Sequence, residues 1–295
     1  MITTIARLLP EYILTLRHKG RTEATLRAYA CDLRAAGAAF PHDITAISRV
    51  ELEAWLAEAQ TASTQARKLA SLRTFFAWCL ARDLISRDPT LGLEARRTTR
   101  RLPRPVNGDT DRTVLDAAIA RYAMPVRLIF TLLRETGMRV GEVLALNMGD
   151  VTLTPGTEGL HVRDPKNRVE RVVALGPNST ERSIRLLRRH LKALGDVPAT
   201  QPLFCSNRAT RLRYGTVLYH WGKLCTAAGL CDTAGAPRYT IHQLRHTTAT
   251  EMLEAGHKIE IVQRRLGHRD IRTTMGYAEV SDATVREALE GGPRR

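Results

Sequence analysis

A chain of 295 residues is longer than one compact core usually needs, so we expect two domains. The formal net charge of +15 and the pI near 10.3 favour a polyanionic partner such as nucleic acid, although an arginine-rich composition alone also raises both. The five cysteines form no CxxC pair, which argues against a zinc site and for a reducing compartment. No apolar run approaches the about 18 residues of a membrane span, so we expect a soluble, cytoplasmic protein.

The first part of the chain, residues 1–94, has the pattern of a compact helical bundle. Within this part, Asp88-Pro89 ends the last helical run, because the residue before a proline is disfavoured in the helical conformation. Apolar residues at helical spacing predict helices over residues 3–17, 22–40, 47–59 and 63–82. In the last of these helices Gln65, Lys68 and Arg73 lie away from the apolar stripe, so this face meets either solvent or a DNA groove.

A basic, proline-containing linker follows at residues 95–110. Two prolines favour an extended backbone there, and no acidic residue lies between residues 96 and 105. We predict that the linker follows a DNA backbone, with a plain disordered spacer as the alternative. Its arginines are Arg96, Arg97, Arg100, Arg101 and Arg104.

The remaining residues, 111–295, predict a second domain that is rich in helices and contains a few strands. Alternating apolar residues predict strands over residues 151–153, 159–163 and 169–175. Helical spacing predicts helices over residues 111–123, 124–136, 138–146, 179–194, 212–228, 241–254, 259–266 and 280–289. The fold class is therefore mainly α with two domains: an N-terminal helical bundle and an α-rich domain with a small antiparallel β-sheet.

Histidine, arginine and tyrosine gather in residues 240–277. On a helix, His242 and Arg245 are three residues apart, so both side chains lie on one face and can hold one phosphate. His246, His268 and Tyr277 follow. Cations beside a phenol suit attack of tyrosine on a phosphodiester, because they stabilise the charge that develops on phosphorus.

Two earlier residues could complete such a site. Arg139 lies between the helix-ending Gly137 and a new apolar helix, where Glu142 can pair with it; a surface salt bridge of small energy is the alternative. Lys166 lies on a predicted turn between two strands. A lysine in a desolvated site can donate a proton, which arginine does poorly, whereas most turn lysines are only solvated.

Four separate motifs of this chain resemble those of the tyrosine recombinase (phage integrase) family, most closely its short Xer-type members. They are Thr136–Glu142 (TGMRVGE), His242–Thr247 (HQLRHT), Leu266–His268 (LGH) and Tyr277. The resemblance implies that residues 1–94 are a core-DNA-binding domain. It also implies that residues 111–295 are the catalytic domain, with a C-terminal tail at 278–295.

The resemblance also implies a mechanism. Tyr277 would be the nucleophile that forms a 3′-phosphotyrosine and releases a 5′-hydroxyl, with neither ATP nor metal required. Lys166 would be the general acid, and His242 would assist proton transfer at the tyrosine. Arg139, Arg245 and His268 would hold the scissile phosphate.

The implied partners are double-stranded DNA and further copies of the chain. The resemblance implies a tetramer across two sites, in which a C-terminal helix either passes to a neighbouring protomer or packs on its own domain. Contacts with DNA are expected from Lys68, Arg73, Arg96, Arg97, Arg100, Arg101 and Arg104. The alternatives are a type IB topoisomerase-like enzyme, or a catalytically silent DNA-binding protein of the same fold.

Overall fold

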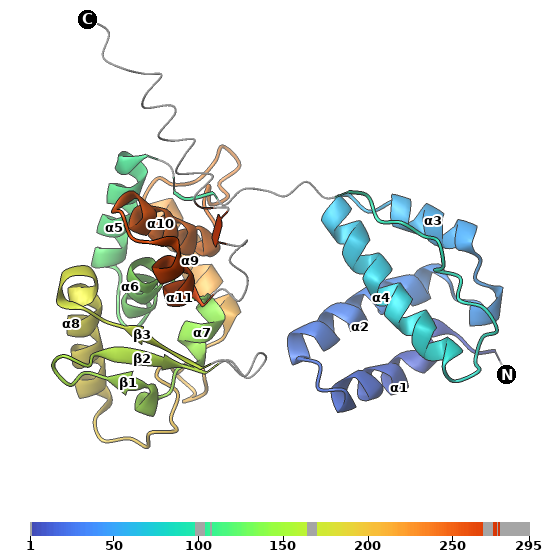
Figure 1. Ribbon diagram of the computed structural model, residues 1–295, viewed down its shortest axis with the longest axis horizontal. Helices are drawn as coiled ribbons and strands as arrows, with labels where there is room; N and C mark the ends of the chain where they lie inside the picture. The colour runs from blue at the N-terminus through green and yellow to red at the C-terminus, as the bar shows by residue number, and fades with distance from the viewer. Residues whose placement is uncertain are drawn as a thin grey trace, which may run out of the picture. The chain divides into compact units, whose positions relative to one another are not determined.

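The computed structural model describes residues 2–97, 104–106, 108–163, 170–267, 274–275 and 277, without the side chains of 177–179. It divides into two compact units, Met1–Arg100 and Arg101–Arg295 (Figure 1). The described residues form helices and one small antiparallel sheet, which confirms the predicted fold class. No helix among these residues is long and apolar enough to cross a membrane.

The first unit is a bundle of helices around an aromatic core. Its elements are α1 (Ile5–His18), α2 (Glu23–Ala39), the 3-10 helix η1 (Ile44–Ala46), α3 (Arg49–Ala57) and α4 (Ala62–Leu80). Tyr12 of α1 makes edge contacts with Phe75 and Trp78 of α4, at ring-centroid distances of 5.3 and 5.4 Å. Such aromatic contacts add to the stabilisation that burial of apolar area provides.

The third helix begins two residues later than the sequence predicts. Ser48 is its N-cap: its hydroxyl accepts from the Glu51 backbone N–H, and the Glu51 carboxylate accepts from the Ser48 N–H at 2.8 Å. This reciprocal capping box satisfies two backbone donors at once and so fixes the start of α3.

The sequence predicted Gln65 on the polar face of α4, and this prediction is wrong. Gln65 is buried, and its Oε1 accepts a hydrogen bond of 2.8 Å from the backbone N–H of Arg96. The Arg96 guanidinium donates to the carbonyls of Ala57 and Ala59 at the C-terminal end of α3, where the helix dipole favours a cation. The start of the linker is therefore bound to the first unit.

The second unit is built around one apolar helix, α6 (Val126–Thr136), which packs against α5, α7, α8 and α10. Figure 1 shows α6 in green between α5, α8 and α10. The sheet has the order β1-β2-β3 and is antiparallel, with Leu160 opposite Val173. The elements are α5 (Asp109–Arg121), α6 (Val126–Thr136), α7 (Val140–Ala145), η2 (Met148–Asp150), β1 (Val151–Thr152), β2 (Gly159–Val162), β3 (Arg171–Ala174), α8 (Pro177–Leu194), α9 (Tyr214–Ala227), α10 (Ile241–Glu254) and α11 (Ile259–Leu266).

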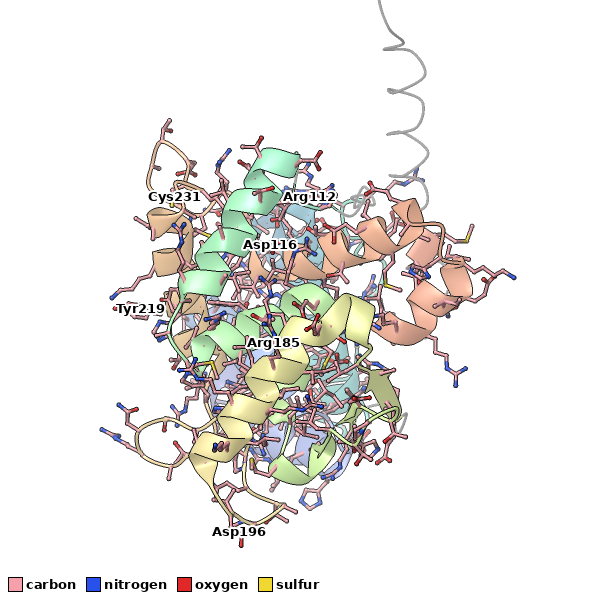
Figure 2. The ribbon with its side chains drawn as sticks, turned by 90° about the vertical axis from the view of Figure 1, so that its left-hand side faces the viewer. Arg112, Asp116, Arg185, Asp196, Tyr219 and Cys231 are labelled. Atoms are coloured by element: carbon pink, nitrogen blue, oxygen red, sulfur yellow. The ribbon has the colours of Figure 1, made fainter. Side chains whose placement is uncertain are left out.

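An ion-pair network ties α6 to its neighbours. The Arg134 guanidinium donates to both carboxylate oxygens of Glu251 on α10 at 2.6 Å, and it pairs with Asp116 on α5 at 3.1 Å (Figure 2 labels Asp116). The Thr248 hydroxyl also donates to the Arg134 carbonyl at 2.6 Å. These bonds fix α10 against α6.

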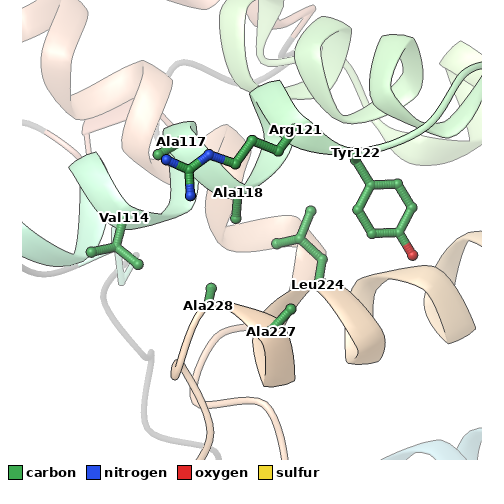
Figure 3. A pocket seen from close by; sticks show the side chains of 8 residues that line it. All are labelled: Val114, Ala117, Ala118, Arg121, Tyr122, Leu224, Ala227 and Ala228. Atoms are coloured by element: carbon green, nitrogen blue, oxygen red, sulfur yellow. The ribbon is translucent and has the colours of Figure 1, made fainter.

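A small apolar groove lies between α5 and α9 in the same unit (Figure 3). Its lining consists mainly of alanine, leucine and valine side chains, with Arg121 and Tyr122 on α5 and just after it. The residues are Val114, Ala117, Ala118, Arg121, Tyr122, Leu224, Ala227 and Ala228.

The end of α6 allows a test of this packing. Gly137 has φ of +67°, and an added Cβ would lie 2.7 Å from the Leu266 side chain and 3.5 Å from that of Thr248. We expect Gly137→Ala to lower the free energy of unfolding by about 2–4 kcal/mol, through backbone strain and overpacking together. Urea unfolding followed by circular dichroism measures this.

The matched control is Gly256→Ala. Gly256 has φ of +80° but no neighbouring atom within 4 Å of an added Cβ, so it tests the backbone strain alone. We expect a loss of about 1 kcal/mol there. Equal losses in the two variants would contradict the close packing of Gly137 against α11.

Candidate active site

The helix α10 presents the central residues of the site. Thr240 caps it, and the Gln243 side chain accepts from the Thr240 backbone N–H at 2.7 Å. His242, Arg245 and His246 follow at relative positions 0, +3 and +4, so they lie along one side of the helix.

Arg245 is the most deeply buried charge of this group, with 2% of its surface exposed. Its Nη1 donates to the Gly137 carbonyl at 2.7 Å and its Nη2 to the Leu266 carbonyl at 2.8 Å. These carbonyls lie at the C-terminal ends of α6 and α11, where the helix dipoles favour a cation. Burial and the nearby Arg139 charge lower the pKa of Arg245 to about 10, so the guanidinium stays charged at pH 7.

One carboxylate positions two further arginines. Glu142 accepts from Arg139 Nη1 at 2.8 Å and from the Arg139 backbone N–H at 2.8 Å, at the start of α7. Both of its oxygens also accept from Arg171 of β3, at 3.1 and 2.9 Å. Burial opposes ionisation of Glu142, but the hydrogen bonds from Arg171 and Arg139 outweigh it and lower the pKa of Glu142.

Tyr277 lies in a small apolar cluster beside α10. Its ring is 2% exposed and packs with Ala249, Val262 and Leu266. The Tyr277 hydroxyl is 2.8 Å from Nδ1 of His246. Burial raises the pKa of Tyr277, although the nearby charges of Arg245 and Arg139 act in the opposite direction.

The two histidines of α10 are neutral at physiological pH. Burial, then His242 and Arg245, lower the pKa of His246 to about 4. Desolvation, then the charges of Arg245 and Arg139, lower the pKa of His242. The rings of the two histidines meet edge to face, with centroids 4.8 Å apart.

The charge balance of this cluster suits an anion. The guanidinium groups of Arg139, Arg171 and Arg245 outnumber the single carboxylate of Glu142. No group of acidic, histidine or cysteine side chains among the described residues could hold a metal ion. A phosphodiester could therefore be bound by arginines within reach of a buried phenol.

The structure brings four of the six predicted catalytic residues into one site. Arg245 donates to the carbonyl of Gly137, two residues before Arg139, and His246 contacts both the ring of His242 and the hydroxyl of Tyr277. Lys166 and His268 lie outside the described residues.

The sequence did not assign roles to three residues of the site. His246 was visible only as a second histidine beside Arg245, and its contact with Tyr277 needs the tertiary fold. Glu142 was expected at most to pair with Arg139. Arg171 was predicted only as part of a strand. Its position shortly after the predicted hairpin turn was the one feature of the sequence that could have indicated a role in the site.

The predicted DNA contacts have different surroundings. The Lys68 ammonium lies 4.1 Å from the ring centroid of Trp55, and Arg73 donates to the Leu93 carbonyl. Arg96 is bound to the end of α3, as described above. Arg97 and Arg104 are exposed, and Arg100 and Arg101 lie outside the described residues.

Comparison with known proteins matches both units. The phage integrase family model matches residues 110–284, and the model of the phage integrase N-terminal SAM-like domain matches residues 9–83. A tyrosine recombinase XerC of Corynebacterium efficiens is 32% identical over 284 residues, which cover 92% of this chain and 85% of that protein.

Two lambda integrase structures share the fold. A dimer bound to a COC′ core site has a TM-score of 0.72 at 22% identity, covering 91% of this chain and 96% of that chain. A tetramer bound to a Holliday junction has a TM-score of 0.71 at 23% identity, covering 91% of this chain and 78% of that chain.

The two units thus match the domains of a class of DNA strand-transfer enzymes. The chain belongs to the phage integrase family. It is a tyrosine-type enzyme of site-specific DNA recombination.

Glu142 provides a pH-dependent test of the site. In Glu142→Gln the mutual repulsion of Arg139 and Arg171 is no longer compensated, and we expect the free energy of unfolding at pH 7 to fall by about 2 kcal/mol. The folded-state pKa of Glu142 is lowered, so its contribution is full above the unfolded pKa of about 4.3 and is lost as pH falls through the folded pKa.

Urea unfolding of wild type and variant from pH 7 down to pH 3.5 measures this difference. Glu53→Gln is the control, because Glu53 forms an exposed i,i+4 pair with Arg49 that should contribute less than about 1 kcal/mol. A Glu142 effect as small as that of Glu53, or one that grows as the pH falls, would contradict the ion-pair role.

Proposed function

We propose that this recombinase cleaves one strand of double-stranded DNA by attack of the Tyr277 hydroxyl on a phosphodiester. The reaction forms a 3′-phosphotyrosine and releases a 5′-hydroxyl, and a 5′-hydroxyl of a partner strand then attacks the link. The observation that carries the proposal is the position of Tyr277, buried beside Arg245 with its hydroxyl against His246. Because the phosphotyrosine conserves the energy of the broken bond, the exchange requires neither ATP nor metal.

Arg139 and Arg245 are the proposed clamp on the phosphate. A guanidinium has five N–H donors, and Arg245 uses two of them on main-chain carbonyls. Arg139 is held by Glu142 through one nitrogen, and 43% of its side-chain surface is exposed to an incoming ligand. Preorganised cations of this kind stabilise developing negative charge without reorganisation during the reaction.

The remaining roles follow from the family resemblance. We assign His268 a hydrogen bond to the phosphate, Lys166 the protonation of the leaving 5′ oxygen, and His242 assistance with proton transfer near the tyrosine. We also assign Glu142 the positioning of Arg139, and Arg171 the positioning of Glu142, on the basis of their hydrogen bonds.

We further propose that the N-terminal unit and the basic linker hold the duplex. Arg97 and Arg104, exposed on the linker, and Lys68 on α4 are the favoured phosphate contacts, together with Arg100 and Arg101. Arg73 and Arg96 would have to exchange their present main-chain partners for DNA. Assembly is proposed as a tetramer on two duplexes in the cytoplasm, supported by the lambda integrase tetramer on a Holliday junction.

Covalent capture on DNA tests the nucleophile. Wild type is incubated with a library of nicked duplexes of random sequence, on which cleavage releases a short fragment and traps the enzyme. We expect wild type to form an adduct resistant to SDS and Tyr277→Phe to form none, because the phenylalanine has no attacking oxygen. Sequencing the trapped DNA yields a defined duplex, on which a mobility shift confirms that Tyr277→Phe still binds. An adduct that survives this substitution would show that another residue attacks.

A sulfur-substituted substrate tests Lys166. On the recovered duplex we expect Lys166→Ala to slow cleavage by ~10²–10⁴-fold, the usual range for loss of a general acid. A 5′-thio leaving group needs little protonation, so it should restore the rate of Lys166→Ala. The exposed Lys258→Ala is the control and should cleave both substrates at the wild-type rate. Failure of the thio substrate to restore cleavage would exclude the general-acid role.

A further inference from the structure

The neighbourhood of the Tyr277 hydroxyl contains a group without a role in the mechanism as stated so far. His246 lies one helical turn after His242 on α10, and its Nδ1 is 2.8 Å from the Tyr277 oxygen. His242 lies near the start of α10, and its ring meets that of His246 edge to face.

We propose that His246 is the proton acceptor for Tyr277 during DNA cleavage, with His242 assisting through its ring contact with His246. This inference rests on the proposed function, because it concerns the same attack on a phosphodiester. The distance is that of a short O–H···N hydrogen bond, and a general base must lie within about 2.6–3.2 Å of the group whose proton it takes.

The environment of His246 favours this assignment. Burial and the neighbouring His242 and Arg245 keep its imidazole unprotonated at neutral pH. A neutral imidazole has one acceptor nitrogen, and with the proton on Nε2 the acceptor is Nδ1, which faces the phenol. The ring is held between the edge contact with His242 and the tilted contact with Tyr277, at centroid distances of 4.8 and 5.4 Å.

The other charges around the pair act to lower the pKa values of both His246 and Tyr277. Among the described residues, the groups facing His246 are His242 and Arg245 on its own helix and Tyr277 from the segment after α11. Arg139 from α7 acts on His242, Arg245 and Tyr277. Burial keeps the phenol protonated in the free enzyme, so its proton must be removed as the bond to phosphorus forms.

The step balances without any added reagent. As the Tyr277 oxygen bonds to phosphorus, its proton passes to His246 Nδ1, while the bond from phosphorus to the 5′ oxygen breaks and that oxygen receives a proton from the general acid. In the joining step the attacking 5′-hydroxyl loses its proton to the general acid, which gave up its own proton during cleavage. The Tyr277 oxygen leaves phosphorus and recovers its proton from His246.

Single-turnover cleavage of the duplex recovered by covalent capture tests this role. We compare wild type with His246→Ala, which removes the ring, and with His246→Asn. The asparagine amide can lie near the position of Nδ1 and accept a hydrogen bond, but it cannot take a proton. We expect both variants to cleave ~10²–10³-fold more slowly than wild type at pH 7.

The pH profile separates proton transfer from positioning. Without an internal acceptor, cleavage depends on the small phenolate fraction, so the rate of both variants should rise about tenfold per pH unit between pH 7 and 9. The wild-type rate should stay nearly flat over this range. The gap between wild type and the variants should therefore narrow steadily toward alkaline pH.

The chain contains a matched control. His220 on α9 pairs its Nδ1 with the Tyr122 hydroxyl at 2.9 Å, which is the same type of contact away from the site. His220→Ala should cleave within twofold of wild type at every pH. Circular dichroism and a mobility shift on the same duplex confirm folding and binding for each variant.

The outcomes separate this inference from the proposed function. If wild type forms no adduct at all, the proposed function and this inference fail together. If wild type forms the adduct and His246→Ala cleaves within twofold of it, His246 is not the acceptor. If His246→Asn cleaves at the wild-type rate, or if the variants share the flat wild-type pH profile, His246 only positions the hydroxyl and proton transfer belongs elsewhere.

Discussion

The burial of Arg245 is the constraint on which the site depends. A guanidinium with 2% of its surface exposed is tolerated only where other groups replace its hydration. The chain provides carbonyls at the ends of two helices, α6 and α11, which must therefore finish at the same point in space. Glycines at both ends, Gly137 and Gly267, have positive φ and allow these terminations. The position of Arg245 in the proposed phosphate site is thus a consequence of where these helices stop.

The surrounding ion pairs fix the helices that carry this arrangement. Arg134 joins α6 to Glu251 of α10, two turns beyond Arg245. On the other side, Glu142 joins α7 to β3 through Arg139 and Arg171. Each network uses partly buried carboxylates to hold arginines, so removal of one carboxylate leaves buried positive charge less compensated. The position of Arg139 relative to Arg245 therefore depends on contacts between four separate elements.

Much of this could be predicted from the sequence, because local patterns determine local structure. Apolar spacing placed the helices of the described residues, and Gly137 and Gly267 marked two of their ends correctly, whereas the predicted helix over 280–289 lies outside these residues. The motifs around Arg139, Arg245 and Tyr277 indicated a phosphate site. Periodicity assigns a side chain to a face, however, and does not identify its partner. The burial of Gln65 against Arg96, the two bonds from Arg171 to Glu142 and the contact of His246 with Tyr277 join distant segments, so they required the fold.

The same charges have opposite effects on the two ends of the proton transfer. Arg245 and Arg139 act to lower the pKa of Tyr277, but burial of the ring outweighs them and the phenol stays protonated. Burial and the charge of Arg245 lower the pKa of His246 to about 4, which keeps it ready to accept while making it a weak base. An added negative charge would raise the pKa of His246, because it compensates Arg245. A phosphodiester bound by the arginines has this charge. In the proposed mechanism the bound phosphodiester would therefore strengthen the base, and without DNA the site would have neither a phenolate nor a strong acceptor.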